Sequence, residues 1–252
     1  MLVTGGDTGI GRATCVRLAE EGAAVAVTDV RTDDATETAR LVEEVGGSAT
    51  VHELDVTDEA ATQRVIADAA ATLGGLDGLF ANAGITTAGR IHELTLEDWH
   101  RVIAVNLTGP FLSIKHALPH LIDTGGGAIV ATGSVSSVVN GLGGGAVSYK
   151  ASKGGVLQIV RAVATEYADD GVRANCVCPG FVATKIVDHA IEIADETSTP
   201  RSDHRPEARL RPPMSRAAEP AEIASVVAFL LSDDASFLTG SAVMADGGYT
   251  SI

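Results

Sequence analysis

A tyrosine and a lysine one helical turn apart are the residues in this sequence best placed to do chemistry. Tyr149 and Lys153 have the i,i+4 spacing that puts two side chains on one face of a helix. A phenol has an ordinary pKa of about 10 and is a poor base at neutral pH, but a cation held beside it stabilises the phenolate and lowers that pKa. The pair therefore predicts a general acid/base, although an isolated pair with this spacing is more often a surface contact.

A serine follows a short apolar run ahead of this pair. Ser134 comes just after the run at residues 128–132, at the end of a predicted strand, where open α/β sheets bind their ligands. Its hydroxyl can donate a hydrogen bond to a substrate oxygen and stabilise the negative charge that develops there. Ser136 and Ser137 are alternatives, and we favour Ser134 because it follows the strand directly.

One asparagine interrupts an apolar helical stretch. Asn106 lies in Val105-Asn106-Leu107, and a buried amide needs hydrogen-bond partners. We expect Asn106 to hold a water molecule in contact with Lys153.

A glycine-rich loop joins the first apolar run to an amphipathic segment. Its glycines allow a tight turn and a close approach of the backbone to a phosphate, and the helix that follows offers N–H groups and the positive end of its dipole. The spacing G-x-x-x-G-x-G differs from the usual G-x-G-x-x-G, so the loop alone also fits a structural turn. The residues that we expect to contact a dinucleotide here are Gly5, Asp7, Thr8, Gly9, Ile10 and Gly11.

An acidic residue at the end of the second apolar run strengthens this interpretation. Asp29 lies about 20 residues after Gly9, where a carboxylate can accept hydrogen bonds from an adenosine ribose diol. A carboxylate there repels a 2′-phosphate, so the sequence favours NAD over NADP. Arg31 argues the other way, because an arginine could bind that phosphate, whereas Arg12 is interpreted as a solvated residue in the first helical turn.

Two later strand ends complete the predicted nucleotide site. Asp55, followed by Val56, could contact the adenine amino group, or it could cap the helix predicted at residues 59–73, with Thr57 competing for that role. The small residues of Asn82-Ala83-Gly84 would let a flat ring lie against the backbone, and Asn82 can hold the turn.

Composition excludes several classes of protein. The 252 residues include 18 Lys and Arg against 33 Asp and Glu, a net charge of −15 that argues against binding to a nucleic-acid backbone. No apolar run is long enough for a membrane span, and no basic region precedes one at the N-terminus. Cys15, Cys176 and Cys178 are too few for a disulfide framework, so we interpret them as buried apolar side chains of a cytoplasmic protein.

A metal site is also not expected. His116 and His120 have helical spacing that could suit a metal, but Pro119 lies between them and no neighbouring carboxylate completes the set.

The apolar runs predict the fold class. They are continuous rather than alternating, which is typical of a parallel sheet covered on both faces, and they alternate with helical stretches. We therefore predict an α/β fold, a Rossmann-type doubly wound parallel sheet in three layers, with residues 1–252 as a single domain. Beyond the first apolar residues, the predicted strands are at 23–28, 49–54, 76–81, 128–132, 173–177 and 241–245, and the helices at 11–21, 59–73, 96–121 with a bend at Pro110, 149–167 and 220–231.

One segment departs from this alternation of strands and helices. Residues 185–216 are rich in proline and carry five arginines, which predicts a substrate lid at about 185–216. The simpler interpretation is a solvated loop. The more specific interpretation is that an arginine in this segment contacts a carboxylate or a phosphopantetheine-bearing substrate. The five arginines are Arg201, Arg205, Arg209, Arg211 and Arg216.

Taken in order along the chain, the motifs resemble the short-chain dehydrogenase/reductase family in its single-domain form. The matching stretches are T-G-x-x-x-G-I-G at 4–11, N-A-G at 82–84, Y-x-x-x-K at 149–153, P-G-x-x-x-T at 179–184 and the closing Ala245-Asp246-Gly247-Gly248. One departure is that Ser134 lies two residues farther from Tyr149 than the corresponding serine commonly does in the family. Ser136 lies at the common spacing.

The resemblance implies a catalytic tetrad of Asn106, Ser134, Tyr149 and Lys153. Tyr149 would exchange the proton, Ser134 would orient the substrate oxygen, and Lys153 would bind the nicotinamide ribose. Further residues implied to cover the nicotinamide are Pro179, Gly180, Val182 and Thr184.

The expected function is NAD(P)-dependent interconversion of a secondary alcohol and a ketone, with NAD preferred, in a homotetramer. The alternatives are an NADPH-dependent reductase of 3-oxoacyl thioesters on acyl carrier protein and a nucleotide-sensing relative without activity. Apolar residues of the 149–167 helix, such as Val156, Leu157, Val160 and Val163, fit either a subunit interface or the core.

Overall fold

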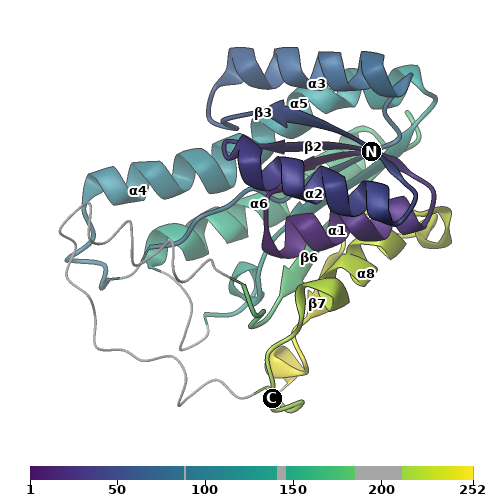
Figure 1. Cartoon of the computed structure of the whole chain (residues 1–252). Coiled ribbons are helices and arrows are strands. Elements are labelled where there is room, and N and C mark those ends of the chain that lie inside the picture. Colours follow the sequence, from purple (N-terminus) through teal and green to yellow (C-terminus); the bar gives the residue numbers. More distant parts are fainter. Residues whose placement is uncertain (88, 141–145, 185–211, 252) are drawn as a thin grey trace.

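In the part of the chain that the structure describes, seven parallel strands form one sheet in the order β3-β2-β1-β4-β5-β6-β7 (Figure 1). The computed structural model describes residues 1–87, 89–140, 146–184 and 212–251. Strand order reverses at β1, which pairs with β2 on one side and β4 on the other, so the predicted doubly wound fold is confirmed. The strands are β1 (Leu2–Thr4), β2 (Ala24–Asp29), β3 (Ser48–Glu53), β4 (Gly78–Ala81), β5 (Gly127–Thr132), β6 (Val172–Pro179) and β7 (Ala242–Ala245).

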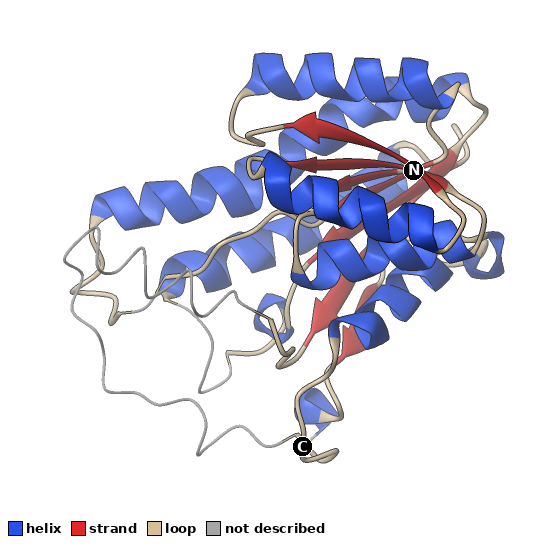
Figure 2. Ribbon diagram, viewed as in Figure 1, coloured by secondary structure: helices blue, strands red, loops and turns tan. Residues whose placement is uncertain are grey.

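Helices cover both faces of this sheet (Figure 2). Helices α1, α2 and α8 pack together on one face, and α3, α5 and α6 on the other. Among the described residues, no helix combines the length and the apolar character needed to cross a membrane. The helices are α1 (Gly9–Glu20), α2 (Thr32–Glu44), α3 (Glu59–Leu73), α4 (Leu96–Ile103), α5 (Gly109–Asp123), α6 (Val147–Glu166) and α8 (Pro220–Leu231).

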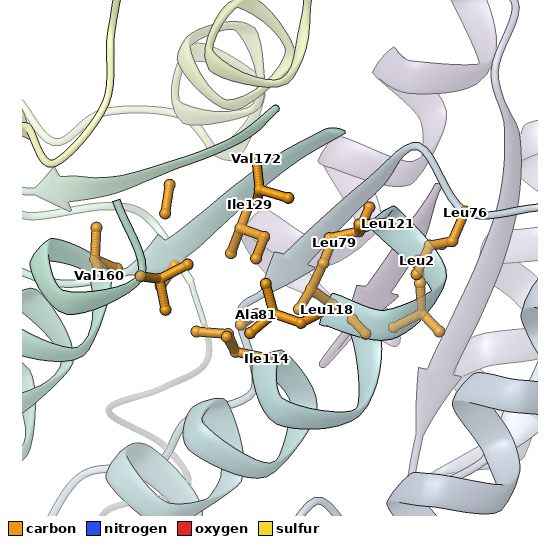
Figure 3. Close-up of a cluster of buried hydrophobic side chains, with 14 of the residues drawn as sticks. Leu2, Leu76, Leu79, Ala81, Ile114, Leu118, Leu121, Ile129, Val160 and Val172 are labelled. Atoms are coloured by element: carbon orange, nitrogen blue, oxygen red, sulfur yellow. The ribbon is translucent and has the colours of Figure 1, made fainter. Parts of the chain in front are cut away.

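The core consists of two apolar layers separated by the sheet. Strand β4 shows why its sequence is continuously apolar: Leu79 packs into the layer under α5 and α6, whereas Phe80 packs into the layer under α1 and α8. Figure 3 shows the first layer, where Leu79 and Ile129 of adjacent strands meet Leu121 of α5. Each such side chain is fully buried and contributes roughly 1.5–3 kcal/mol through its removal from water.

The four apolar residues of α6 that fitted either role lie in this core. Val156, Leu157, Val160 and Val163 are at most 6% exposed within the single chain. They are therefore core residues, and the expected homotetramer stays a prediction.

Helix α2 is absent from the sequence prediction. Its buried side chains are small, namely Ala35, Thr38, Ala39 and Val42, and six of the other nine residues are charged. A narrow stripe of small residues gives a weak apolar period, although it is sufficient to pack α2 against α1.

The helical stretch predicted at residues 96–121 contains an irregular turn. A π-helical turn at Ala104–Thr108 joins α4 to α5, and Pro110 follows it in the first turn of α5. The irregular turn thus lies just before Pro110, where the sequence predicts a bend.

We expect two glycine substitutions to have opposite effects. A methyl group added at Gly11 would lie 1.8 Å from the Gly5 carbonyl oxygen, so Gly11→Ala must displace the glycine-rich loop. At Gly154, within α6, a methyl group would meet no atom of the described chain within 4 Å apart from its own helical backbone. Urea unfolding should show a loss of about 2 kcal/mol or more for Gly11→Ala and a gain of about 0.5–1 kcal/mol for Gly154→Ala. A Gly11→Ala protein as stable as the wild type would contradict the close packing of loop and helix.

Candidate active site

One asparagine amide joins three strands where their carboxyl ends meet. Asn82 Nδ2 donates to the Gly5 carbonyl at 3.0 Å, and Thr132 Oγ1 at the end of β5 donates to Asn82 Oδ1 at 3.0 Å. The backbone N–H groups of Asn82 and Ala83 donate to Thr4 Oγ1 at the end of β1, at 3.0 and 3.2 Å. The glycine-rich loop, the 82–84 loop and the end of β5 are thus held together as one site.

The glycine-rich loop has a backbone that few other residues could adopt. Gly5 and Gly9 have φ angles of +65° and +54°, and Thr8 precedes α1 without a side-chain hydrogen bond to cap it. The first N–H groups of α1 and its dipole therefore face the loop, which fits a pyrophosphate. Thr184 reaches this loop from beyond β6, since a methyl group added at Gly9 would lie 3.2 Å from its Cγ2.

Asp29 stands at the end of β2 beside a second carboxylate. Burial, followed by the nearby charge of Asp7, raises the pKa of Asp29 to about 6. Its Oδ1 accepts a hydrogen bond from the Arg31 backbone N–H at 3.0 Å, and the Arg31 guanidinium forms a salt bridge with Asp7. The sequence analysis missed this salt bridge, because nothing in the spacing of residues 7 and 31 pairs them.

Arg12 is not a solvated residue as the sequence analysis expected. Its guanidinium donates to Thr38 Oγ1 and to the Asp34 carbonyl, both at 3.0 Å, and its side chain is 27% exposed. Arg12 therefore joins α1 to α2.

Neither proposed cap of α3 is the cap. Asp58 holds that position and accepts a hydrogen bond from the Ala61 N–H at 3.0 Å. Asp55 is exposed and accepts from Thr57 through both its N–H and its hydroxyl, while Val56 is buried against Gly109. The Asp55 carboxylate therefore lies just after β3 and does not cap α3.

Tyr149 and Lys153 face the end of β5, as the helical spacing predicts. The Lys153 Nζ atom lies 5.6 Å from the centre of the Tyr149 ring and donates to the Thr132 carbonyl at 2.7 Å. The Ser134 side chain is near enough to Tyr149 to act on its pKa, which favours it over the two alternative serines.

Ser136 and Ser137 form hydrogen bonds that hold the serine loop in place. Ser136 donates its backbone N–H to Ser134 Oγ at 3.1 Å. The Ser137 hydroxyl accepts from the Ser134 N–H at 3.2 Å and donates to the Lys153 carbonyl at 2.7 Å, which ties the serine loop to α6.

The electrostatics of Tyr149 differ from the sequence expectation. Burial raises the pKa of Tyr149, and the Ser134 hydrogen bond only partly offsets that shift. Burial also lowers the pKa of Lys153 to about 8. The expected lowering of the tyrosine pKa by Lys153 was wrong for this structure, because the ammonium lies over the ring and bonds to a carbonyl, and desolvation dominates both groups.

Asn106 is fully buried in the π-helical turn, where its side chain bonds to the backbone of Ile85. Its Oδ1 accepts from the Ile85 N–H and its Nδ2 donates to the Ile85 carbonyl, both at 2.8 Å. These two hydrogen bonds to the Ile85 backbone fix the loop after Gly84. A methyl group at Gly84 would lie 3.5 Å from Asn106 Oδ1 and 3.6 Å from Lys153 Nζ, so the three residues meet.

All three cysteines fall within the described residues and are buried free thiols, as expected. Cys176 and Cys178 also pack directly behind the serine loop, since a methyl group at Gly133 would lie 2.5 and 3.0 Å from their sulfurs. Small side chains at these two positions let the loop approach β6.

The segment after β6 borders the same edge of the sheet. Strand β6 ends at Pro179, Gly180 packs against Asp246, and Val182 forms a bridge with Ala218. Most of the predicted lid, residues 185–211, lies outside the described residues, together with four of its arginines. Arg216 donates to both carboxylate oxygens of Glu222, at 2.6 and 2.7 Å.

Comparison with known proteins agrees with this geometry. A family profile described as enoyl-(acyl carrier protein) reductase matches residues 5–250. The chain is 42% identical to cis-4-hydroxycyclohexanecarboxylate dehydrogenase of Sinomonas cyclohexanicum, over 100% of this chain and 96% of that protein. It is 39% identical to meso-2,3-butanediol dehydrogenase of Serratia marcescens and 37% identical to cyclohexanol dehydrogenase of an Acinetobacter species, each over 99% of this chain and 94% of the relative.

Solved structures agree as well. The crystal structure of levodione reductase superposes with a TM-score of 0.89 at 35% identity, covering 99% of this chain and 96% of that one. Carveol dehydrogenase from Mycobacterium avium, in complex with NAD, superposes with a TM-score of 0.88 at 29% identity, covering 100% and 98%.

The raised pKa of Asp29 predicts a dependence of stability on pH. Its folded pKa of about 6 lies above the usual carboxyl pKa of 3.8, so the ionised carboxylate destabilises the folded state above pH 6, and this cost fades as pH falls towards 4. Asp29→Asn should therefore raise the free energy of unfolding by on the order of 1–3 kcal/mol at pH 7.5 and by much less near pH 4.5. Urea titrations at the two pH values measure this, with the exposed Asp33→Asn as control. An equal gain at both pH values would contradict the assignment.

Proposed function

The chain belongs to the short-chain dehydrogenase/reductase family, and from that premise we propose that it interconverts a secondary alcohol and a ketone with NAD as the hydride carrier. The observation that carries this proposal is the meeting of Tyr149, Ser134 and Lys153 at the end of β5, on the same sheet edge as the glycine-rich loop.

The residues at the end of β5 suit proton transfer to or from an oxygen. Tyr149 donates its phenolic proton to the ketone oxygen in reduction and accepts the alcohol proton in oxidation. Ser134, whose side chain lies near Tyr149, donates to the same oxygen and stabilises its partial charge. Nicotinamide, when bound, supplies or accepts the hydride.

Lys153 contributes a positive charge from a fixed place. Its bond to the Thr132 carbonyl and its near-complete burial hold the ammonium between Tyr149 and the 82–84 loop. There it can bind the hydroxyls of a ribose and favour the phenolate in the transition state of oxidation. Asn106 acts through the loop that it holds at Ile85.

Preference for NAD is supported by Asp29. Its carboxylate at the end of β2 suits the two hydroxyls of an adenosine ribose and would repel a 2′-phosphate. The NAD-bound carveol dehydrogenase, which superposes over the whole chain, is consistent with this preference.

The substrate class that we propose is a small secondary alcohol. The relatives named above act on a cyclohexanol, a hydroxycyclohexanecarboxylate and a butanediol. Val138 and Phe181, which follow β5 and β6 at the site's edge, are 47% and 53% exposed and suit an alicyclic ring.

Removal of the phenolic hydroxyl should separate chemistry from binding. We expect Tyr149→Phe to lower kcat for cyclohexanol oxidation by about 10²-fold or more, because the general base is lost. Binding of NADH, followed by its fluorescence, should stay within about threefold, because the ring remains.

The matched control is Tyr167→Phe, at the end of α6 and away from β5's carboxyl end, which should retain activity. A panel of cyclic alcohols, butanediols and 3-oxoacyl thioesters, each with both cofactors, tests the substrate class. A fully active Tyr149→Phe protein would contradict the proposed chemistry. Activity confined to thioesters with NADPH would contradict the proposed substrate class.

The two directions should respond oppositely to pH. Because burial raises the pKa of Tyr149, kcat/KM for alcohol oxidation should rise with pH, as more phenolate forms. Ketone reduction should instead fall at high pH, as the Tyr149 phenol loses its proton. Profiles of kcat/KM in both directions measure this. Parallel profiles in the two directions would contradict these roles.

A further inference from the structure

The Ser137 hydroxyl connects the two segments that carry the proposed proton transfer. It accepts a hydrogen bond from the Ser134 N–H at 3.2 Å and donates one to the Lys153 carbonyl at 2.7 Å. A hydroxyl has one proton to donate and lone pairs to accept, so both bonds form at the same time. The second bond joins residues that are 16 apart in the sequence. The serine loop, residues 133–137, is therefore held against the turn of α6 that carries Tyr149 and Lys153.

The turn that contains Ser134 is closed by further hydrogen bonds. The Ser137 N–H donates to the Ser134 carbonyl at 2.8 Å, and the Ser136 N–H donates to Ser134 Oγ at 3.1 Å. Because that N–H occupies a lone pair of the Ser134 oxygen, the hydroxyl proton stays available for an acceptor in the site. The turn thus suits Ser134 to the role of a donor to a substrate oxygen.

Packing keeps water away from the groups that Ser137 joins. Ser134 is 8% exposed and Lys153 is 3% exposed, while Ser137 itself is half-buried. A methyl group at Gly133 would lie 2.9 Å from Ser137 Oγ, so the glycine lets the hydroxyl approach the end of β5. Loss of this hydroxyl would take an acceptor from the Ser134 N–H where water reaches poorly, and the loop would have to shift to find another.

We propose that Ser137 is a positioning residue for the reaction, because its two hydrogen bonds hold the Ser134 hydroxyl in register with Tyr149. This inference rests on the proposed function, in which Ser134 and Tyr149 act on the same oxygen. A misplacement of about 1 Å in an active site can cost on the order of 10²-fold in rate. A side chain that acts only on the position of Ser134 can therefore have a large effect on kcat.

The first test separates turnover from cofactor binding. Ser137→Ala should lower kcat for cyclohexanol oxidation with NAD by about tenfold, because the Ser134 hydroxyl is no longer held in place. The dissociation constant of NADH, followed by its fluorescence, should stay within about threefold, because the glycine-rich loop is unchanged.

The matched control removes a hydroxyl from the same helix. Thr165 is exposed and donates to the Arg161 and Ala162 carbonyls of α6 at 3.1 and 2.9 Å, about 18 Å along the helix from Lys153. Thr165→Ala should keep kcat within about twofold of the wild type. Thermal melts of both variants verify that each is folded at the assay temperature.

A double-mutant cycle shows whether Ser137 acts through Ser134. Ser137→Ala introduced into the Ser134→Ala protein should lower the remaining kcat by less than about twofold, because the hydroxyl that Ser137 positions is already absent. Single-turnover rates at high enzyme concentration measure these slow variants. Ser137→Cys, with a side chain of similar size that forms weaker hydrogen bonds, should also lower kcat and replaces Ser137→Ala if that variant folds poorly.

The outcomes separate this inference from the proposed function. Wild-type kcat in the folded Ser137 variants, or an equal loss with and without the Ser134 hydroxyl, overturns the role of Ser137 and leaves the proposed reaction standing. A Ser134→Ala protein as active as the wild type, or a wild type that oxidises no alcohol, overturns the proposed function, and this inference with it.

Discussion

The hydrogen bonds of Asn82 hold together the glycine-rich loop, the 82–84 loop and the end of β5, and the proposed chemistry takes place where these segments meet. Parallel pairing brings the ends of β1, β4 and β5 to one edge, but it does not fix the loops that leave them. The Asn82 amide, with Thr4 and Thr132, joins those loops across three strands. Thr132 also supplies the carbonyl that receives Lys153, so the same few residues position the nucleotide loop and the proton-transfer group.

Desolvation sets the properties of the ionisable groups at this edge. It raises the pKa values of Tyr149 and Asp29 and lowers that of Lys153, in each case as the first cause. All three groups are therefore shifted towards their neutral forms and respond strongly to a charged ligand brought against them. A dinucleotide and a polar oxygen are ligands of that kind, which links the burial of the site to its proposed function.

Close backbone approach is a second constraint on the site. Gly11 lies so near the Gly5 carbonyl that α1 can begin only with glycine there, and Gly84 leaves room for Asn106 and Lys153 to meet. The π-helical turn serves the same end, because it turns the Asn106 amide onto the Ile85 backbone. Local irregularity in α4 and α5 is thus what fixes the loop beside the reacting groups.

The sequence alone determined the parallel sheet, the glycine-rich loop and the shared helical face of Tyr149 and Lys153, since these depend on period and spacing between near neighbours. It did not determine α2, whose small buried residues give little signal, or the cap at Asp58. Only the tertiary structure paired Asn106 with Ile85 and joined Asp7 to Arg31. Those contacts join residues from different elements, and their partners are set by how the strands and helices pack, which no local pattern records.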